Sequence, residues 1–277
     1  MKEVAPREED QVFAQFYRPH EAEKCSEPLY RFISEYDDLV GAFFFTVMNA
    51  RRMDEVRGIA KRALDQIKSP PGNAPSDSTA DGPVFKQVRK YGPLLSRNLV
   101  IGMANNFFSY VSEMLQIVLR RKPEVLRSSE RLTNEEVLQF TRINELVAYM
   151  ADKKVNELAY GGIRGVEDYV RERLGVSLFD SEEQRVKLTV LAELRNIHTH
   201  NRGIVNEIFL RRVGQPKLGS LTFRQDNAAY VNFDDFIILS RNAIDLALRL
   251  DANLAKKFGI RRLPYGKRRS NDAEVAG

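Results

Sequence analysis

The sequence predicts an all-α protein, an antiparallel bundle of helices, and three observations point to this fold class. Over most of the chain, apolar residues recur at intervals of three and four, which is the spacing of one face of an α-helix. Two stretches, at 133–136 and 180–183, place Thr or Asp three residues before Glu, the pattern of a capping box that starts a helix. Residues with β propensity are confined to two short runs, at 221–224 and 229–231.

The composition limits the class of protein. The 277 residues are 43% hydrophobic and 29% charged, enough for one sizeable core or two small ones. The net charge of +5 permits a polyanionic partner without requiring one. A single cysteine, Cys25, rules out an internal disulfide and fits a reducing compartment. Residues 1–10 lack the apolar core of a signal peptide, and the longest apolar run, 39–48, is too short to span a bilayer. We therefore expect a cytoplasmic protein with no membrane partner.

The N-terminal part of the chain is predicted to contain an arm, a helical hairpin and a linker. Residues 1–27 are charged and irregular, and we expect a loosely held arm. Pro28 can open a helix, and apolar residues at helical spacing then continue through 28–68, which we interpret as a helical hairpin. Residues 69–84 are rich in Pro, Gly, Ser and Asp and are predicted to be a flexible linker.

Residues 85–260 are predicted to form one helical domain. Its first long helix covers Leu99–Leu119 and carries one wide apolar stripe (Leu99, Met103, Phe107, Tyr110, Val111, Met114 and Val118) and one polar stripe (Asn105, Ser109, Ser112, Gln116 and Arg120). The second helix follows the capping box at 133–136, and Gly161-Gly162 is expected to end it; its expected core face is Val137, Phe140, Ile143, Val147, Met150, Val155 and Leu158. A shorter helix at 166–174 precedes Gly175.

The last part of this domain carries the helix of greatest interest. That helix begins after 180–183, directs Val186, Val190, Leu191, Leu194 and Ile197 inward, and ends near His200. A small β-hairpin is predicted over 221–231, with its turn at Asp226-Asn227. A final helix starts at Asn232 or Asp234, and 261–277 forms a basic tail that we expect to be solvated.

The candidate site is the string Arg195-Asn196-x-x-x-His200. Arg supplies a cationic fork for phosphate oxygens, and His can exchange a proton near neutral pH. On a helix Asn196 and His200 share a face, whereas Arg195 and His200 are about 140° apart. The helix must therefore end or bulge here, and Gly203 makes an end plausible. The alternative is a polar helix end in which His200 caps carbonyls and Arg195 is solvated.

Two further features lie near this string in sequence or on the neighbouring helix. His198 and His200 could suggest a metal, but they point about 200° apart on a helix and no third ligand has suitable spacing, so no metal site is expected. Glu113 borders the apolar stripe of the Leu99–Leu119 helix. It is either an edge carboxylate paired with an arginine or a partner that orients Arg195 or His200.

A helical bundle with this string late in a central helix, followed by Asn201-Arg202-Gly203-Ile204-Val205-Asn206, resembles the HEPN superfamily, in particular its bacterial members linked to conflict and phage defence. The resemblance covers roughly residues 91–258. By the resemblance, Arg195 and His200 are the catalytic pair, and Asn196 matches a position that is usually polar. Some relatives have Tyr where this chain has Arg202, so chemistry tied to that Tyr is not assumed.

The resemblance implies an endoribonuclease that needs no metal or other cofactor and acts as a toxin or phage-defence effector. Its active site would be shared across a homodimer, formed chiefly by the motif helix and the Leu99–Leu119 helix. RNA is the implied partner, an antitoxin or regulatory partner would fit, and Arg202 and Glu113 are candidate substrate-binding residues. Two alternatives remain: a non-catalytic HEPN module that dimerises and binds RNA or protein, and an unrelated helical scaffold in which Arg195 and His200 are structural.

Overall fold

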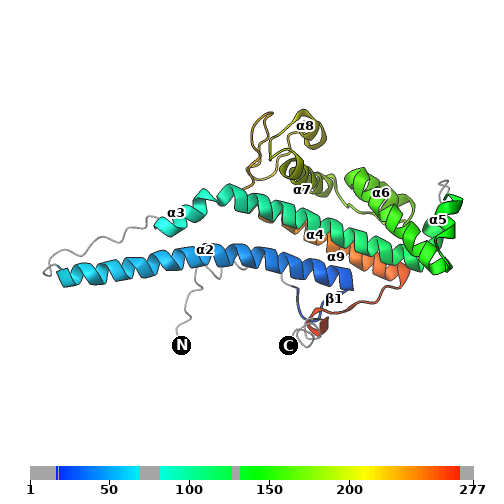
Figure 1. The fold of residues 1–277 in the computed structure, drawn as a ribbon, viewed down its shortest axis with the longest axis horizontal. Coiled ribbons are helices and arrows are strands. Elements are labelled where there is room, and N and C mark those ends of the chain that lie inside the picture. Colours follow the sequence, from blue (N-terminus) through cyan, green and yellow to red (C-terminus); the bar gives the residue numbers. More distant parts are fainter. Residues whose placement is uncertain (1–16, 18, 69–81, 127–131, 269–277) are drawn as a thin grey trace.

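Helices make up most of the computed structural model, which describes residues 17, 19–68, 82–126 and 132–268, without the side chains of 63–68 and 159–161 (Figure 1). The all-α prediction is thus confirmed for this part of the chain. In chain order the elements are β1 (Lys24–Cys25), α2 (Glu27–Lys68), α3 (Pro83–Lys90), α4 (Gly92–Arg121), the 3-10 helix η1 (Pro123–Leu126), α5 (Asn134–Leu138), α6 (Ile143–Glu172), α7 (Glu182–His200), α8 (Glu207–Val213), α9 (Phe233–Phe258) and β2 (Leu263–Pro264). No helix of the described residues is long and apolar enough to cross a membrane.

Helix α4 is the central element, because α2, α6, α7 and α9 all pack against it (Figure 1). The apolar stripe predicted on this helix is buried, with Met103, Met114 and Val118 fully enclosed. Burial of such side chains is the main favourable contribution to folding. The polar stripe is exposed or half-buried, and its exposed Asn105 accepts a hydrogen bond from Arg195 of α7.

Helix α2 corrects the prediction of an N-terminal helical hairpin. It is one continuous helix of 42 residues, about 63 Å long at 1.5 Å per residue. No proline or glycine pair interrupts the chain near Met48–Met53, so the backbone has no reason to turn there. Its first half buries Leu29 and Phe32 in the bundle, while the second half contacts α3.

Helix α3 begins inside the predicted linker at 69–84. The carboxylate of Asp54, on α2, accepts hydrogen bonds from the backbone N–H groups of Val84 (3.0 Å) and Phe85 (2.7 Å), and so caps α3. Pro83 and Val84 therefore belong to a helix and not to the predicted linker at 69–84. Residues 69–81 of that linker lie outside the described part of the chain.

The predicted second helix is divided differently in the structure. The Thr133–Glu136 capping box is present, but α5 ends at Leu138 and α6 begins only at Ile143. Ile143, expected on the core face, is 70% exposed, because the break rotates it out of the helical register. The expected stop at Gly161-Gly162 is instead a kink: α6 continues past Gly162, whose φ of +69° lies in the region that glycine favours.

The predicted β-hairpin at 221–231 is wrong in its pairing. A turn forms there, with Asp226 at φ +63°, but its far side pairs with the chain just after α7. Ala229 N–H donates to the Gly203 carbonyl (2.8 Å), and Val205 N–H donates to the Asn227 carbonyl (2.9 Å). The hairpin prediction considered only neighbours in sequence, whereas the segment after α7 offered these backbone groups a closer partner.

The described ends of the predicted arm and tail, residues 24–27 and 262–268, are docked, which corrects the expectation of a loose arm and a solvated tail for these residues. Strand β1 pairs with β2 in antiparallel register, Cys25 opposite Leu263. Arg262 pairs with the fully buried Asp251 of α9 at 2.8 Å, and Arg268 pairs with Glu27. Burial raises the pKa of the Cys25 thiol to about 11, so it stays protonated. Residues 1–16 and 269–277 lie outside the described part of the chain.

Candidate active site at the end of helix α7

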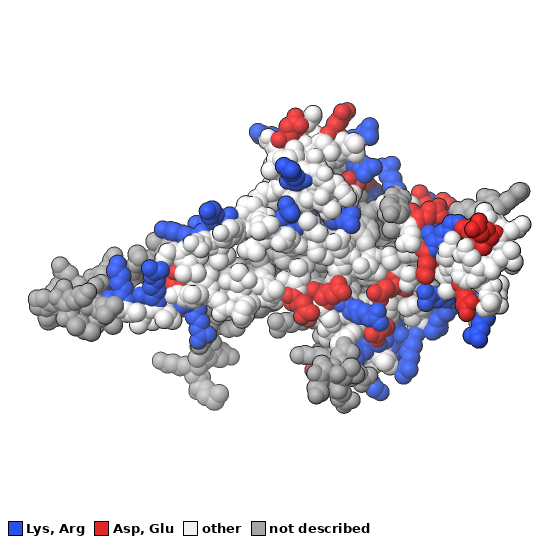
Figure 2. All heavy atoms as spheres, viewed as in Figure 1, with Lys and Arg blue, Asp and Glu red and all other residues white. Residues whose placement is uncertain are grey.

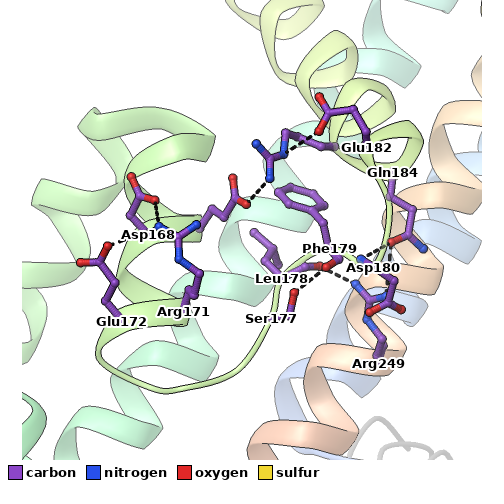
Figure 3. Close-up of polar contacts among 12 residues, drawn as sticks. Asp168, Arg171, Glu172, Ser177, Leu178, Phe179, Asp180, Glu182, Gln184 and Arg249 are labelled. Carbon is purple, nitrogen blue, oxygen red and sulfur yellow. Dashed lines mark hydrogen bonds and ion pairs between the residues drawn. The ribbon is translucent and has the colours of Figure 1, made fainter.

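The start of α7 is fixed by a cap and by contacts with α9. Ser181, not Asp180, is the capping residue, and its hydroxyl accepts a hydrogen bond from Gln184 N–H at 3.2 Å. Arg249 of α9 donates to the Leu178 carbonyl (2.6 Å) and to Gln184 (3.2 Å) and pairs with Asp180 (Figure 3). These contacts position the whole motif helix relative to α9.

The other end of α7 lies where the motif predicts it. His200 is the last helical residue, and the Ile197 carbonyl accepts from the N–H groups of Asn201 (2.8 Å) and Gly203 (2.9 Å). The Ile197 carbonyl thus accepts from both the capping residue and the second residue beyond it, which closes the end of the helix. Arg202 takes the left-handed conformation, φ +53°, where glycine or asparagine is usual. The prediction that the helix ends here is confirmed.

Arg195 is held by two amide side chains. Its Nε donates to Asn105 Oδ1 of α4 at 2.9 Å, and one terminal nitrogen donates to Asn196 Oδ1 at 3.2 Å. Among the described residues no carboxylate pairs with it. The guanidinium is therefore oriented but keeps its positive charge, which suits it to an anion. Sequence reasoning did not single out Asn105, although its place on the polar stripe of α4 was the available signal.

His200 and Arg195 do not contact each other. The His200 side chain is exposed and makes no hydrogen bond to any described residue, while Arg195 is half-buried against α4. This separation is the one expected from their 140° offset on a regular helix. The structure thus brings Arg195, Asn196 and Asn105 together and leaves His200 on a different face. The alternative in which His200 caps carbonyls and Arg195 is solvated does not describe this arrangement.

His198 is a core residue. Only 8% of it is exposed, and its Nδ1 has no hydrogen-bond partner among the described residues. Its ring packs on Gly203, where an added Cβ would lie 2.6 Å from Nδ1. Burial, and then the charge of Arg97 on α4, lower the pKa of His198 below 6.5, so the ring is neutral at pH 7. The described residues contain no group of three or more His, Cys, Asp or Glu that could hold a metal ion.

The two candidate substrate-binding residues lie in different places. Glu113 forms an ion pair with Arg31 of α2 at 3.3 Å, the edge-carboxylate arrangement, and makes no hydrogen bond or ion pair with Arg195 or His200. Burial raises the pKa of Glu113, and Arg31 partly offsets this. Arg202 is exposed at the turn that follows α7.

Comparison with known proteins adds no relative: no family model, curated protein or solved structure matches this chain. Figure 2 shows Lys and Arg side chains around the base of the layer formed by α7 and α8, beside a broad face without charge. A basic rim of this kind favours an anionic ligand.

Proposed function

We propose that this protein is a HEPN-type endoribonuclease that cleaves RNA by attack of the ribose 2′-hydroxyl on the adjacent phosphate, without a metal ion. One observation carries the proposal. Arg195 is oriented by Asn105 and Asn196, and no described carboxylate neutralises it, at the end of the helix whose last residue is the exposed His200. An oriented cation and a solvent-accessible imidazole at the same helix end are a minimal set of groups for phosphodiester cleavage.

Each group has a distinct task in this reaction. The 2′-hydroxyl must lose a proton, and the leaving 5′-oxygen must gain one. His200 suits such transfers because an exposed imidazole can both accept and donate a proton. Arg195 stabilises the added negative charge on the pentacoordinate phosphorus through the fork geometry of its guanidinium. Asn196 links the two, since it holds Arg195 and lies one turn before His200 on the same helix.

A single chain supplies only one imidazole at this position. His198 is buried, and His20 precedes β1, near the N-terminal end of the described chain. Concerted acid and base catalysis uses two such groups, so we propose a homodimer whose twofold axis lies near His200 and brings a second imidazole and guanidinium. The separation of Arg195 from His200 within one chain fits a site that combines groups from two subunits. A cytoplasmic toxin or phage-defence effector with an antitoxin or regulatory partner would use the same site.

The alternative function is a non-catalytic HEPN module that dimerises and binds RNA or a protein. The same separation favours it, because two side chains that do not meet need not act together. The two proposals differ in one measurable respect, which is whether RNA is cut.

The decisive experiment incubates the purified full-length protein with total RNA in the presence of EDTA. We expect cleavage that is lost in His200→Ala and retained in His20→Ala, a matched change of an exposed histidine away from α7. Arg195→Lys should also lose activity, because Lys keeps the charge but not the planar two-point contact with phosphate. Cleavage at the wild-type rate by folded His200→Ala protein would exclude the catalytic assignment.

The shared site has its own test. Neither His200→Ala nor Arg195→Ala protein should cut RNA alone, but a mixture should recover part of the activity if one site uses both chains. Protein that is monomeric by light scattering at the assay concentration and still cuts RNA would exclude the shared site.

A further inference from the structure

A second arginine beside α7 is left without a counter-charge. Arg97 of α4 is half-buried, its Nε is buried without a hydrogen-bond partner, and no described carboxylate pairs with it. Its charge is close enough to act on His198, which is itself buried and has an unpartnered Nδ1. Arg97 makes no hydrogen bond to the carbonyls that end α7, so helix capping does not account for it. A desolvated cation of this kind is stabilised when an anion binds to it.

An exposed aromatic side chain lies on the segment that is bonded to α4 one residue before this arginine. Tyr230 is 58% exposed, although its neighbours Ala229 and Val231 are both buried. Ala229 N–H donates to the Gly203 carbonyl, and the Val231 carbonyl accepts from the Ser96 hydroxyl. The backbone at Tyr230 is therefore tied on one side to the turn after α7 and on the other to the residue before Arg97. These ties hold the backbone that carries the exposed ring at a defined place on the surface, and an exposed aromatic face offers a base a surface on which to stack.

We propose that Arg97 and Tyr230 form a nucleotide-binding subsite for single-stranded RNA, in which Arg97 contacts a phosphate and a base stacks on the Tyr230 ring. The inference rests on the proposed function, because it takes RNA as the ligand of the α7 end. Aromatic side chains with neighbouring cations are the usual means of binding unpaired nucleotides. Stacking requires unpaired bases, so the substrate class is single-stranded RNA.

The subsite lies beside the Arg195 contact and not on top of it. Arg97 and Asn105 are eight residues apart on α4, about 12 Å along the helix axis, and Asn105 holds Arg195. An axial spacing of about 12 Å between Arg97 and the residue that holds Arg195 leaves room for separate phosphates of one strand. Arg97 and Tyr230 therefore extend the contact with RNA away from the cleavage position, and we expect them to affect binding more than the chemical step.

The test measures binding in full-length His200→Ala protein, which should not cut its ligand. The probes are a fluorescein-labelled ten-residue oligouridylate and an abasic strand of the same length. Their binding is measured by fluorescence anisotropy over a range of salt concentrations. Tyr230→Ala should weaken oligouridylate binding roughly tenfold, with little effect on the abasic strand. Tyr230→Phe should keep the affinity, because the ring remains. The matched control is Phe45→Ala, which removes a 72% exposed ring on α2.

Arg97 is tested by its salt dependence. Arg97→Ala should weaken both probes equally and lower the slope of log affinity against log salt by about 0.7, the value for one phosphate of a single strand. Arg97→Gln is a second variant in case the alanine protein does not fold, and Arg164→Ala on α6 is the control for loss of one exposed charge. The subsite would be overturned if Tyr230→Ala and Arg97→Ala bound oligouridylate as tightly as the controls. It would also be overturned if the parent protein bound neither probe.

The outcomes separate this inference from the proposed function. If the protein with His200 cuts RNA but binding does not depend on Arg97 or Tyr230, only the subsite is wrong. If binding depends on both residues but no RNA is cut, the subsite stands and the ribonuclease proposal fails.

Discussion

Gly203→Ala is predicted to destabilise the protein by two separable effects. Gly203 has φ +79°, a conformation that costs an L-residue about 1–2 kcal/mol. An added Cβ would also lie 2.6 Å from Nδ1 and 2.9 Å from Cε1 of the buried His198 ring. Overpacking of this kind costs about 1–3 kcal/mol. The lower conformational entropy of the unfolded chain with Ala offsets about 0.4–1 kcal/mol of these costs. We expect a net loss of about 2–4 kcal/mol in the free energy of unfolding.

Gly259→Ala is the matched control for this change. Gly259 caps α9 with φ +68° and ψ +30°, and a Cβ there would meet nothing closer than a 3.9 Å contact with Arg121. It should therefore show only the backbone cost of about 1 kcal/mol. The difference between the two variants, about 1–3 kcal/mol, isolates the contact with His198.

The assay is urea unfolding monitored by circular dichroism. It is applied to a double-mutant cycle between Gly203→Ala and His198→Ala. In the His198→Ala background the contact is gone, and Gly203→Ala should cost no more than Gly259→Ala. The reasoning is refuted if Gly203→Ala and Gly259→Ala are equally destabilising in the wild-type background.

Three further predictions concern charge and strain. Arg262→Ala leaves the carboxylate of Asp251 buried without its partner, and urea unfolding at neutral pH should show a loss of about 3–5 kcal/mol. Burial already raises the pKa of Asp251, and a carboxyl with a raised pKa destabilises the folded state once it is ionised. The loss in Arg262→Ala should therefore shrink in mildly acidic buffer, where Asp251 is protonated. An equal loss at both pH values would contradict the assignment of the loss to a buried, ionised Asp251. Because the pKa of His198 is lowered in the folded state, its contribution to the free energy of unfolding is fully present above pH 6.5 and is lost as the pH falls through the folded pKa. His198→Asn should therefore show a flatter dependence of the unfolding free energy on pH between 6.5 and that folded pKa. Arg202→Gly relieves a left-handed backbone at φ +53° and should stabilise by about 0.5–1 kcal/mol while raising the KM for RNA; unchanged KM would remove Arg202 from the substrate-binding residues.

The sequence alone determined the features that depend on local contacts. The apolar stripe of α4, the capping box at Thr133 and the end of α7 before Gly203 all follow from spacing within a few residues or from the conformational freedom of glycine. The order of the main helices follows in the same way. A helix places side chains three and four apart on one face wherever it occurs, so this information needs no knowledge of its neighbours.

The tertiary structure decided which elements meet. Arg195 binds Asn105, which is 90 residues away, because α7 crosses α4 at that point of its polar stripe. Glu113 contacts Arg31 because the first turns of α2 pack along α4, and the segment after Asp226 pairs with Gly203 and not with its neighbour in sequence. His198 is buried for the same reason, since the turn after α7 folds back onto its ring. Periodicity indicates which face of a helix is apolar, but the partner of each polar side chain depends on how whole helices pack.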